Sequence, residues 1–331
     1  MRNTLNYLFE GNTLTREEAR YSLSRLAGGT YSDVEMAAFL TVFNMRKIRP
    51  EELAGFRDAM LDLAVQVNLQ ETDLIDVCGT GGDEKNTFNI STLSAFVIAG
   101  AGAKVVKHGN YAVSSPCGSS NVMEHFGYRF SNNEIKLQRE IENASICYLH
   151  APLFHPAMKN IAPVRKALKV KTFFNILGPM VNPARPNSQF VGVFSEEIQQ
   201  LYADVYKQIG VNHIIVYSLD GYDEVSLTGN FKYISLQKQE ILSPVSLGLL
   251  IINQNELFGG NTVLEAAKIF ENILTGAGTE AQNSVVTANS AMALKCYYQD
   301  KTLEDCILMA RESLLSKKAF KVFEKLLKLQ N

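Results

Sequence analysis

A short apolar run, a glycine-rich loop and the start of a helix follow one another in residues 74–92, which read LIDVCGTGGDEKNTFNIST. Residues 74–78 predict a buried strand that ends at the glycines, and a helical pattern begins at about Ser91. Residues 104–107 are a second candidate strand. Strand, loop, helix and strand in this order are typical of a parallel α/β layer.

Similar patterns extend this layer toward the C-terminus. We expect further strands over 145–149, 190–194 and 213–218. Helical spacing occurs over 196–209, 262–274, 289–298 and 303–327. Alternating residues over 225–234 indicate a local antiparallel part. The predicted fold class is therefore α/β, with a small all-helical domain and a larger domain over 71–331 that has a mostly parallel central sheet.

Residues 13–67 predict helices only. Capping boxes or a proline mark three helix starts: Thr15 with Glu18, Ser32 with Glu35, and Pro50. Apolar residues recur at steps of three and four after each start, which gives each helix one buried face. We therefore expect an N-terminal helical domain over 1–70.

Prolines are concentrated in one segment between these patterns. Six of the nine lie close together, at positions 152, 156, 163, 179, 183 and 186. Proline does not suit a helix interior, so short helices and fixed turns are expected here. We expect part of 155–185 to join the helical domain and to bridge the two domains.

Composition argues against several classes of protein. Lys and Arg total 32 against 34 Asp and Glu, a net charge of -2, whereas a protein that coats nucleic acid is usually basic. The five cysteines lack C-x-x-C spacing, which argues against a zinc site and for a reducing compartment. Residues 1–10 lack the apolar core of a signal peptide, and the uncharged run 86–103 is too polar for a membrane span. We expect a cytoplasmic protein without nucleic-acid or membrane partners.

The glycine-rich loop over 79–83 has the composition of an anion-binding loop. Glycines let the backbone approach an anion closely, and free N–H groups at the start of the next helix point toward it. A purely structural turn would use the same glycines. It would not need the polar side chains that follow, which are Thr87, Asn89, Ser91 and Thr92.

A second loop of the same kind follows the next strand. It spans 107–115, reads KHGNYAVSS and continues into Gly118-Ser119-Ser120. Lys107 adds a cation. Because the carboxyl ends of parallel strands meet at one edge of a sheet, both loops should face one ligand. A ligand with two separate phosphate groups would fit them.

In these loops and in later motifs the chain resembles the anthranilate phosphoribosyltransferase family, which acts second in tryptophan synthesis. The motifs match in order from residue 72 to 230, and the N-terminal helices fit as well. They are GTGGD at 79–83, NIST at 89–92, KHGN at 107–110, AP at 151–152, HPAMK at 155–159, PVR at 163–165, FNILGP at 174–179, NP at 182–183 and DE at 223–224. The resemblance implies the fold shared by nucleoside phosphorylases and these phosphoribosyltransferases.

The resemblance also implies a reaction and a set of site residues. Phosphoribose would pass from phosphoribosyl pyrophosphate to the amine of anthranilate, with pyrophosphate leaving and Mg²⁺ as the metal. Phosphoribosyl pyrophosphate would contact Gly79, Gly82, Asp83, Thr87, Asn89, Ile90, Ser91, Thr92, Lys107, His108, Gly109, Asn110, Ser114, Ser115 and Ser119. Anthranilate would contact Gly79, Asn110 and Arg165, and Mg²⁺ would bind Ser91, Asp223 and Glu224. A homodimer through the helical domain is implied too.

The chemistry of these residues agrees with the implied roles. Mg²⁺ commonly binds one or two carboxylates plus substrate phosphates, and Asp223 and Glu224 supply such carboxylates. Taken alone, an acidic pair after Gly221 is more often a solvated turn. Arg165 follows Pro163 by two residues, which places it near the first turn of a helix. There its guanidinium can pair with a carboxylate, although alone it would be an ordinary surface arginine.

No catalytic acid or base is expected. The aromatic amine of anthranilate is largely unprotonated at neutral pH, so its attack needs no strong base. Alignment of the amine with the anomeric carbon, and neutralisation of the departing pyrophosphate, should supply most of the rate. We expect His108, His150 and His155 to be positioning or structural residues.

Three positions depart from the family pattern. Tyr111 stands where Arg commonly follows the Asn of the HGN motif, so a fixed charge is lost. Lys171 stands where Arg is frequent and Lys169 where Gly is frequent, both off the principal loops.

Two rival functions remain open. A pyrimidine nucleoside phosphorylase resembles this architecture and has its own glycine-rich phosphate loop. It would leave Arg165 and the acidic pair at 223–224 without a purpose. A non-enzymatic, phosphoribosyltransferase-like protein that binds nucleic acid is the other rival, and the net charge of -2 speaks against it.

Overall fold

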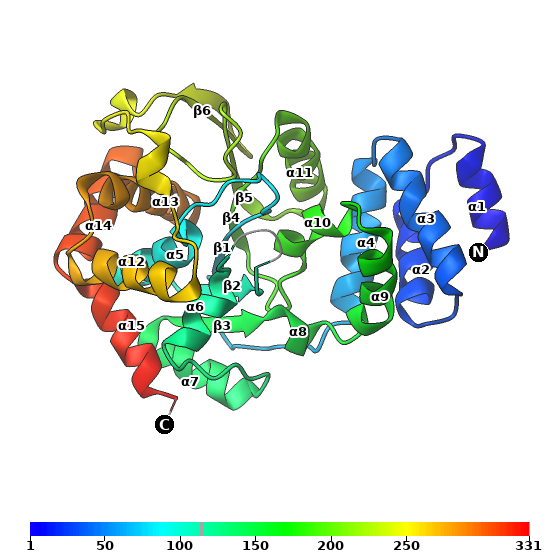
Figure 1. Cartoon of the computed structure of the whole chain (residues 1–331), viewed down its shortest axis with the longest axis horizontal. Coiled ribbons are helices and arrows are strands. Elements are labelled where there is room, and N and C mark those ends of the chain that lie inside the picture. The colour runs from blue at the N-terminus through cyan, green and yellow to red at the C-terminus, as the bar shows by residue number, and fades with distance from the viewer. Residues whose placement is uncertain (113–115, 331) are drawn as a thin grey trace.

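A mostly parallel sheet forms the centre of the larger part of the molecule (Figure 1). The computed structural model describes residues 1–112 and 116–330. Within these residues the sheet has seven strands in the order β3-β2-β1-β4-β5-β6-β7. They are β1 (Ile75–Gly79), β2 (Val105–Gly109), β3 (Ile146–His150), β4 (Ser188–Gly192), β5 (Asn212–Ser218), β6 (Phe231–Ser235) and β7 (Gln239–Leu242). Strands β1 to β5 run parallel to one another. β6 pairs antiparallel with β5, and β7 pairs antiparallel with β6.

The register of the sheet brings the carboxyl ends of neighbouring strands to one edge. Gly79 of β1 lies opposite Gly192 of β4. Gly109 of β2 lies opposite His150 of β3. The two glycine-rich loops therefore leave the sheet at the same edge, as the sequence predicts.

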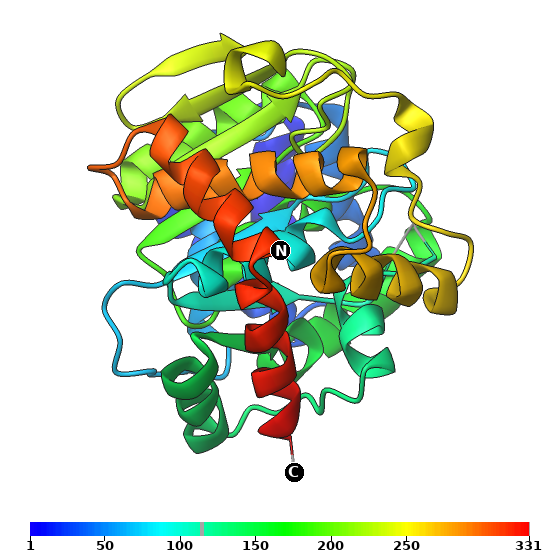
Figure 2. The same ribbon diagram turned by 90° about the vertical axis from the view of Figure 1, so that its left-hand side faces the viewer.

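Helices cover both faces of the sheet. One face packs against α5 (Ile90–Gly100) and α13 (Glu280–Tyr297), and Figure 2 shows α13 and α14 (Leu303–Leu315) in front of the sheet. The other face packs against α11 (Glu196–Ile209) and the N-terminal helices. The remaining helices of this part are α6 (Ser119–His125), α7 (Glu134–Ala144), α12 (Val263–Thr275), α15 (Lys318–Lys328), and the short 3-10 helices η2 (Val245–Leu247) and η3 (Gln254–Leu257). Among the described residues, no helix is both long and apolar enough to cross a bilayer.

The N-terminal helices form a bundle at one end of the molecule (Figure 1). They are α1 (Arg2–Phe9), α2 (Arg16–Ala27), α3 (Asp33–Met45) and α4 (Pro50–Asp62). Both predicted capping boxes are present, at Thr15 and Ser32, and Pro50 is the first residue of α4. α9 (Met158–Leu168) packs against α2 and α3, so a segment distant in sequence completes the bundle.

The proline-rich segment passes between the two parts as short helices and turns. Besides α9 it contains α8 (Ala151–Phe154), α10 (Phe174–Leu177) and the 3-10 helix η1 (Gly178–Val181). Pro163 nevertheless lies inside α9, contrary to the expectation that proline stays out of helix interiors. The helix tolerates it by giving up the hydrogen bond that residue 163 would donate to the Lys159 carbonyl. Arg165 is therefore in the last turn of α9, and its predicted place near a first turn is wrong.

Three other predicted elements differ from the structure by more than a shift of one or two residues. The helix expected over 289–298 begins at Glu280. The helix expected over 303–327 is two helices, because Lys317 adopts a left-handed φ of 62° between α14 and α15. Only the last part of 225–234 is a strand, since Val225 is held by hydrogen bonds with the Asn289 side chain.

Lys169 should be a strained position. It ends α9 with a left-handed φ of 55°, a conformation that favours glycine. Lys169→Gly should raise the free energy of unfolding by about 1 kcal/mol, whereas Lys169→Ala, which keeps the strain, should not. Urea unfolding of the three proteins measures this, and a glycine variant no more stable than the alanine variant would contradict it.

Candidate active site

The first glycine-rich loop folds over the carboxyl ends of β1 and β4. The Thr80 N–H donates to the Gly192 carbonyl at 2.9 Å. The Gly81 N–H donates to Asp223 Oδ2 at 2.6 Å. Gly81 and Gly82 have φ angles of 66° and 80°, which favour glycine. These bonds fix the loop to the segment that carries the acidic pair.

Asp223 occupies space that two glycines leave open. A Cβ on Gly79 would lie 2.3 Å from Asp223 Oδ2, and one on Gly192 would lie 1.6 Å from the Asp223 carbonyl oxygen. A side chain at either position would displace Asp223. The Ser218 hydroxyl donates to the Glu224 carbonyl at 2.6 Å and anchors the pair to the end of β5.

Burial makes the acidic pair costly to ionise. Asp223 and Glu224 are 7% and 6% exposed. Burial, reinforced by the Asp83 carboxylate, raises the pKa of Asp223 to about 8. Burial and the charge of Asp223 also raise the pKa of Glu224, while Lys107 and the Ser91 backbone N–H oppose that rise. A bound divalent cation would relieve this repulsion.

The residues around the pair fit Mg²⁺. Glu224 Oε2 is buried and has no hydrogen-bond partner among the described residues. Ser91, the predicted hydroxyl ligand, lies in the first turn of α5 beside the Glu224 carboxyl. Residues 1–112 and 116–330 contain no preformed metal-binding group of three or more His, Cys, Asp or Glu side chains. A cation here would need further ligands, and Mg²⁺ commonly takes water and substrate phosphate oxygens.

Lys107 is a buried cation beneath the loops. It is 2% exposed, and its Nζ donates to the Val77 carbonyl at 2.8 Å. Its charge opposes the rise that burial causes in the pKa of Asp76, as it does for Glu224. Lys107 thus compensates buried acidic charge at the edge of the sheet.

The start of α5 offers polar groups to an anion. Asn89 is the N-cap residue, and its Nδ2 donates to the Cys117 carbonyl at 3.1 Å, which joins the first loop to the second. Ile90 and Thr92 lie in the first turn, where helical N–H groups have no intrahelical acceptor. The Thr92 hydroxyl is buried and has no partner in the part of the chain that is described. This is the arrangement that binds phosphates at helix starts.

The second loop continues from β2 toward α6. Gly109 has no room for a side chain, because a Cβ there would lie 2.0 Å from the Tyr148 hydroxyl. The Ser119 hydroxyl accepts a hydrogen bond from Tyr148 at 2.7 Å and donates one to the Asn110 carbonyl at 3.3 Å. The Asn110 side chain is exposed. Two predicted site residues lie outside the described residues: Ser114 and Ser115.

Arg165 presents a half-buried guanidinium. It lies over the Phe174 ring at 5.2 Å, and its Nη2 is 3.4 Å from Asn175 Oδ1. Burial lowers its pKa. Within the described residues no carboxylate pairs with it. A carboxylate from outside the chain would therefore find most of its donors available.

Comparison with known proteins identifies the family. A family model described as "Glycosyl transferase family, a/b domain" matches residues 71–320, and one described as "Glycosyl transferase family, helical bundle domain" matches residues 2–64. A protein of Flavobacterium psychrophilum named anthranilate phosphoribosyltransferase is 52% identical over 326 residues, which cover 98% of both chains. The chain belongs to the anthranilate phosphoribosyltransferase family. A protein of the same name from Bacteroides thetaiotaomicron is 48% identical over 331 residues, 100% of both chains.

Solved structures of anthranilate phosphoribosyltransferases share this fold. The enzyme from Thermus thermophilus is 32% identical, with a TM-score of 0.93 over 98% of each chain. The Saccharomyces cerevisiae enzyme in complex with phosphoribosyl pyrophosphate and Mg is 26% identical, with a TM-score of 0.90 over 98% of this chain and 96% of that one. The predicted fold class, a small helical part with a larger α/β part, is confirmed.

Tyr111, where the anthranilate phosphoribosyltransferase family often has Arg, is anchored to neighbouring elements. Its hydroxyl donates to Glu124 Oε1 of α6 at 3.2 Å. Its ring packs edge-on against His150 at 4.9 Å. The side chain therefore packs in place of a cation in the second loop.

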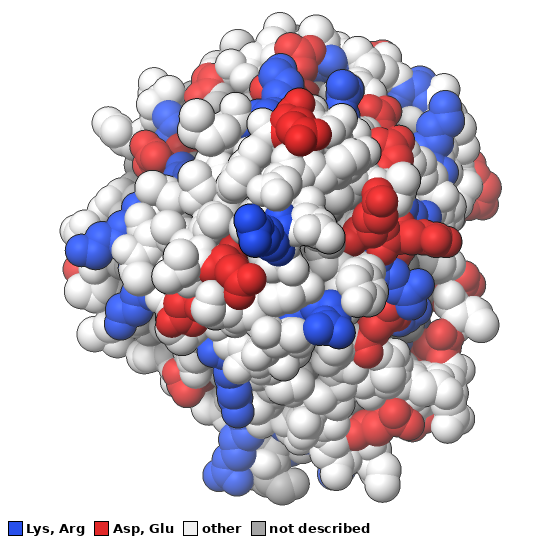
Figure 3. Space-filling model, turned by 90° about the vertical axis from the view of Figure 1, so that its right-hand side faces the viewer, with Lys and Arg blue, Asp and Glu red and all other residues white. Residues whose placement is uncertain are grey.

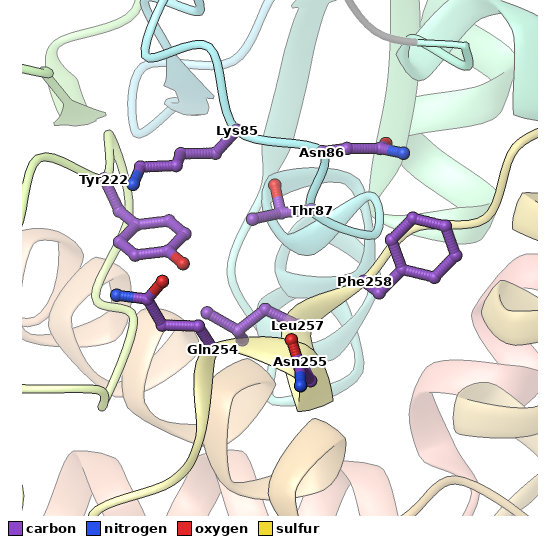
Figure 4. A pocket seen from close by; sticks show the side chains of 8 residues that line it. All are labelled: Lys85, Asn86, Thr87, Tyr222, Gln254, Asn255, Leu257 and Phe258. Atoms are coloured by element: carbon purple, nitrogen blue, oxygen red, sulfur yellow. The ribbon is translucent and has the colours of Figure 1, made fainter.

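A cavity of about 460 Å³ lies beside the first loop (Figure 4). Its lining residues are Lys85, Asn86, Thr87, Tyr222, Gln254, Asn255, Leu257 and Phe258. Thr87, a predicted phosphoribosyl pyrophosphate contact, lines this cavity, and its backbone bridges to Phe258. Lys85 extends to the Tyr222 ring, 4.8 Å from its centre, so the cavity spans from the first loop to the residue before Asp223.

The Lys171 side chain contacts the first loop, although the sequence pattern places it off the principal loops. Its Nζ donates to the Gly82 carbonyl at 2.9 Å and pairs with Glu84 at 3.1 Å. The only signal in the sequence is a lysine at a position where arginine is frequent in the family it resembles. A separation of 89 residues hides such a contact from any local pattern.

Two buried histidines should make stability sensitive to acid. The rings of His108 and His155 lie 5.3 Å apart, and burial lowers the pKa of both, that of His155 to about 4. Below pH 6.5 these two histidines bind protons in the unfolded chain but not in the folded chain. The free energy of unfolding therefore falls as the pH drops from 6.5 toward 4.

His155→Gln should therefore lose about 2 kcal/mol less unfolding free energy between pH 7 and pH 5 than the parent does. Urea unfolding of both proteins at the two pH values measures the difference. Equal losses in the two proteins would show that His155 does not carry this effect.

Proposed function

We propose that the chain transfers the phosphoribosyl group of phosphoribosyl pyrophosphate to the amine of anthranilate, giving N-(5-phosphoribosyl)anthranilate and pyrophosphate in tryptophan biosynthesis. The observation that carries the proposal is the buried pair Asp223 and Glu224, held under a glycine-rich loop at the edge of the sheet where the second loop also begins. A phosphorylase that uses inorganic phosphate has no need of such a pair. The membership of the family supports the same reaction.

The predicted site residues are proposed to act as two groups. The glycine-rich loop, the start of α5 and the second loop would hold phosphoribosyl pyrophosphate. Asn110 and Arg165 would face anthranilate, since one is exposed on the second loop and the other lacks a carboxylate partner among the described residues. Ser91, Asp223 and Glu224 would hold Mg²⁺, which when bound supplies positive charge against the diphosphate.

The residues of the chain would then act by positioning and charge. Arg165 would orient anthranilate through its carboxylate, which directs the amine toward the anomeric carbon. The N–H groups of α5 and the loop would stabilise negative charge as the diphosphate leaves. No side chain needs to remove a proton before attack, and none is proposed as a base.

We also propose a domain division at residues 70 and 71, a homodimer through the helical domain and a cytoplasmic location. The packing of α9 on α2 and α3 supports adding part of 155–185 to the helical domain 1–70.

Exposed apolar side chains on the helical domain support the dimer. They are Phe9, Tyr21, Val34 and Met45. Figure 3 views this end of the molecule and shows uncharged surface between scattered charges. A monomer in sedimentation would contradict the dimer.

The cysteines support the cytoplasmic location. All five are buried thiols, as in a reducing compartment.

The direct test is turnover. Anthranilate is fluorescent, so its loss can be followed after mixing the protein with anthranilate, phosphoribosyl pyrophosphate and Mg²⁺. We expect a loss that depends on all three. No loss, together with phosphorolysis of uridine or thymidine, would favour the nucleoside phosphorylase.

The acidic pair should be needed for Mg²⁺ and not for the fold. Asp223→Asn combined with Glu224→Gln replaces two buried carboxyl groups with amides of similar size. It should lower Mg²⁺-dependent turnover by about 100-fold or more, and the free energy of unfolding should not fall. Glu17→Gln, an exposed change on α2, is the control. A double variant with the parent's rate and Mg²⁺ dependence would refute the metal assignment.

Arg165 should matter for anthranilate more than for phosphoribosyl pyrophosphate. A charge-assisted hydrogen bond contributes about 1.5–3 kcal/mol, so Arg165→Ala should lower kcat/KM for anthranilate roughly 10- to 100-fold. Its effect on kcat/KM for phosphoribosyl pyrophosphate should be smaller. Lys166→Ala, the exposed neighbour on α9, is the control. Equal defects for both substrates would count against a carboxylate-binding role.

A further inference from the structure

Lys171 joins parts of the chain that are far apart in sequence. Its Nζ donates to the Gly82 carbonyl at 2.9 Å and pairs with Glu84 Oε1 at 3.1 Å. Its own carbonyl accepts a hydrogen bond from Asn44 Nδ2 of α3 at 2.9 Å. One residue therefore contacts the glycine-rich loop through its side chain and the helical bundle through its backbone.

The loop end of this contact is conformationally demanding. Gly82 and Glu84 both have positive φ angles, 80° and 60°, and the second is unfavourable for a residue with a side chain. Lys171 Nζ binds this turn from one side, and the Phe194 ring lies 5.7 Å from the same Nζ. The ammonium thus supports a turn in which Glu84 has an unfavourable backbone conformation.

The other end of the contact reaches Arg165. The Thr172 N–H donates to Asn175 Oδ1 at 2.9 Å, and Arg165 Nη2 approaches the same oxygen at 3.4 Å. Residues 165–175 therefore carry both the guanidinium proposed for anthranilate and the ammonium that holds the phosphoribosyl pyrophosphate loop.

We propose that Lys171 is a positioning residue that latches the glycine-rich loop to the segment 165–175 and thereby couples the binding of the two substrates. The identity of the substrates rests on the proposed function, whereas the latch itself does not. The segment 165–175 contributes to both substrate sites. When one substrate binds and restricts this segment, the second substrate loses less conformational entropy on binding. The coupling is reciprocal, so each substrate tightens the other by the same factor.

Hydrogen exchange of the ligand-free chain tests the latch without any substrate. The Thr80 and Gly81 N–H groups are hydrogen-bonded in the loop, so their exchange reports its opening. Lys171→Met should speed their exchange about two- to fivefold, the range of a solvent-exposed ion pair. Lys166→Met, at an exposed lysine that forms no ion pair among the described residues, should not. Unchanged exchange in Lys171→Met overturns the latch.

Kinetics test the coupling. In the parent, KM for anthranilate should fall about two- to fivefold between low and saturating phosphoribosyl pyrophosphate. Lys171→Met should abolish this dependence of KM, while kcat with both substrates saturating stays near the parent value. Lys171→Arg should keep the dependence of KM on phosphoribosyl pyrophosphate. A parent without coupling, a methionine variant with the parent's coupling, or a large loss of kcat with coupling intact overturns the proposal. If the parent turns over no anthranilate, the proposed function fails, and the exchange result alone decides the latch.

Discussion

Two carboxylates buried at the carboxyl edge of a parallel sheet constrain everything around them. Buried charges are costly unless they are paired, and here Asp223 and Glu224 lie side by side with Asp83 near. The backbone is shaped to keep them there, because Gly79 and Gly192 leave no Cβ in the way. Burial raises the pKa of both carboxyl groups, so the pair ionises readily only when a cation binds beside it, which suits a divalent cation and a phosphorylated substrate.

The proline-rich segment determines how the two parts of the molecule meet. α9 packs against the helical bundle, and Phe173 stacks on Phe56 of α4 with ring centres 4.4 Å apart. The same segment carries Arg165, and its Lys171 contacts the first glycine-rich loop at the edge of the sheet. A transferase must align two substrates, and a segment that contacts both parts can position a residue for each.

Local signals in the sequence predicted much of this arrangement. The strands of the parallel sheet, the two loops and the capped N-terminal helices all follow from apolar periodicity, glycine and capping residues within a few positions of one another. Predictions failed where a distant contact outweighed the local preference. Asn289 of α13 holds Val225 out of a strand, 64 residues away in sequence.

The sequence by itself determined most of the helices and strands and the positions of the two glycine-rich loops, because these depend on residue type and short-range spacing. Only the tertiary structure decided the ionisation of Asp223, since its raised pKa depends on burial and on Asp83. It alone placed Lys171 against Gly82, 89 residues away in sequence. Charge burial and long-range contacts arise from how the elements pack, and no local pattern of residues encodes them.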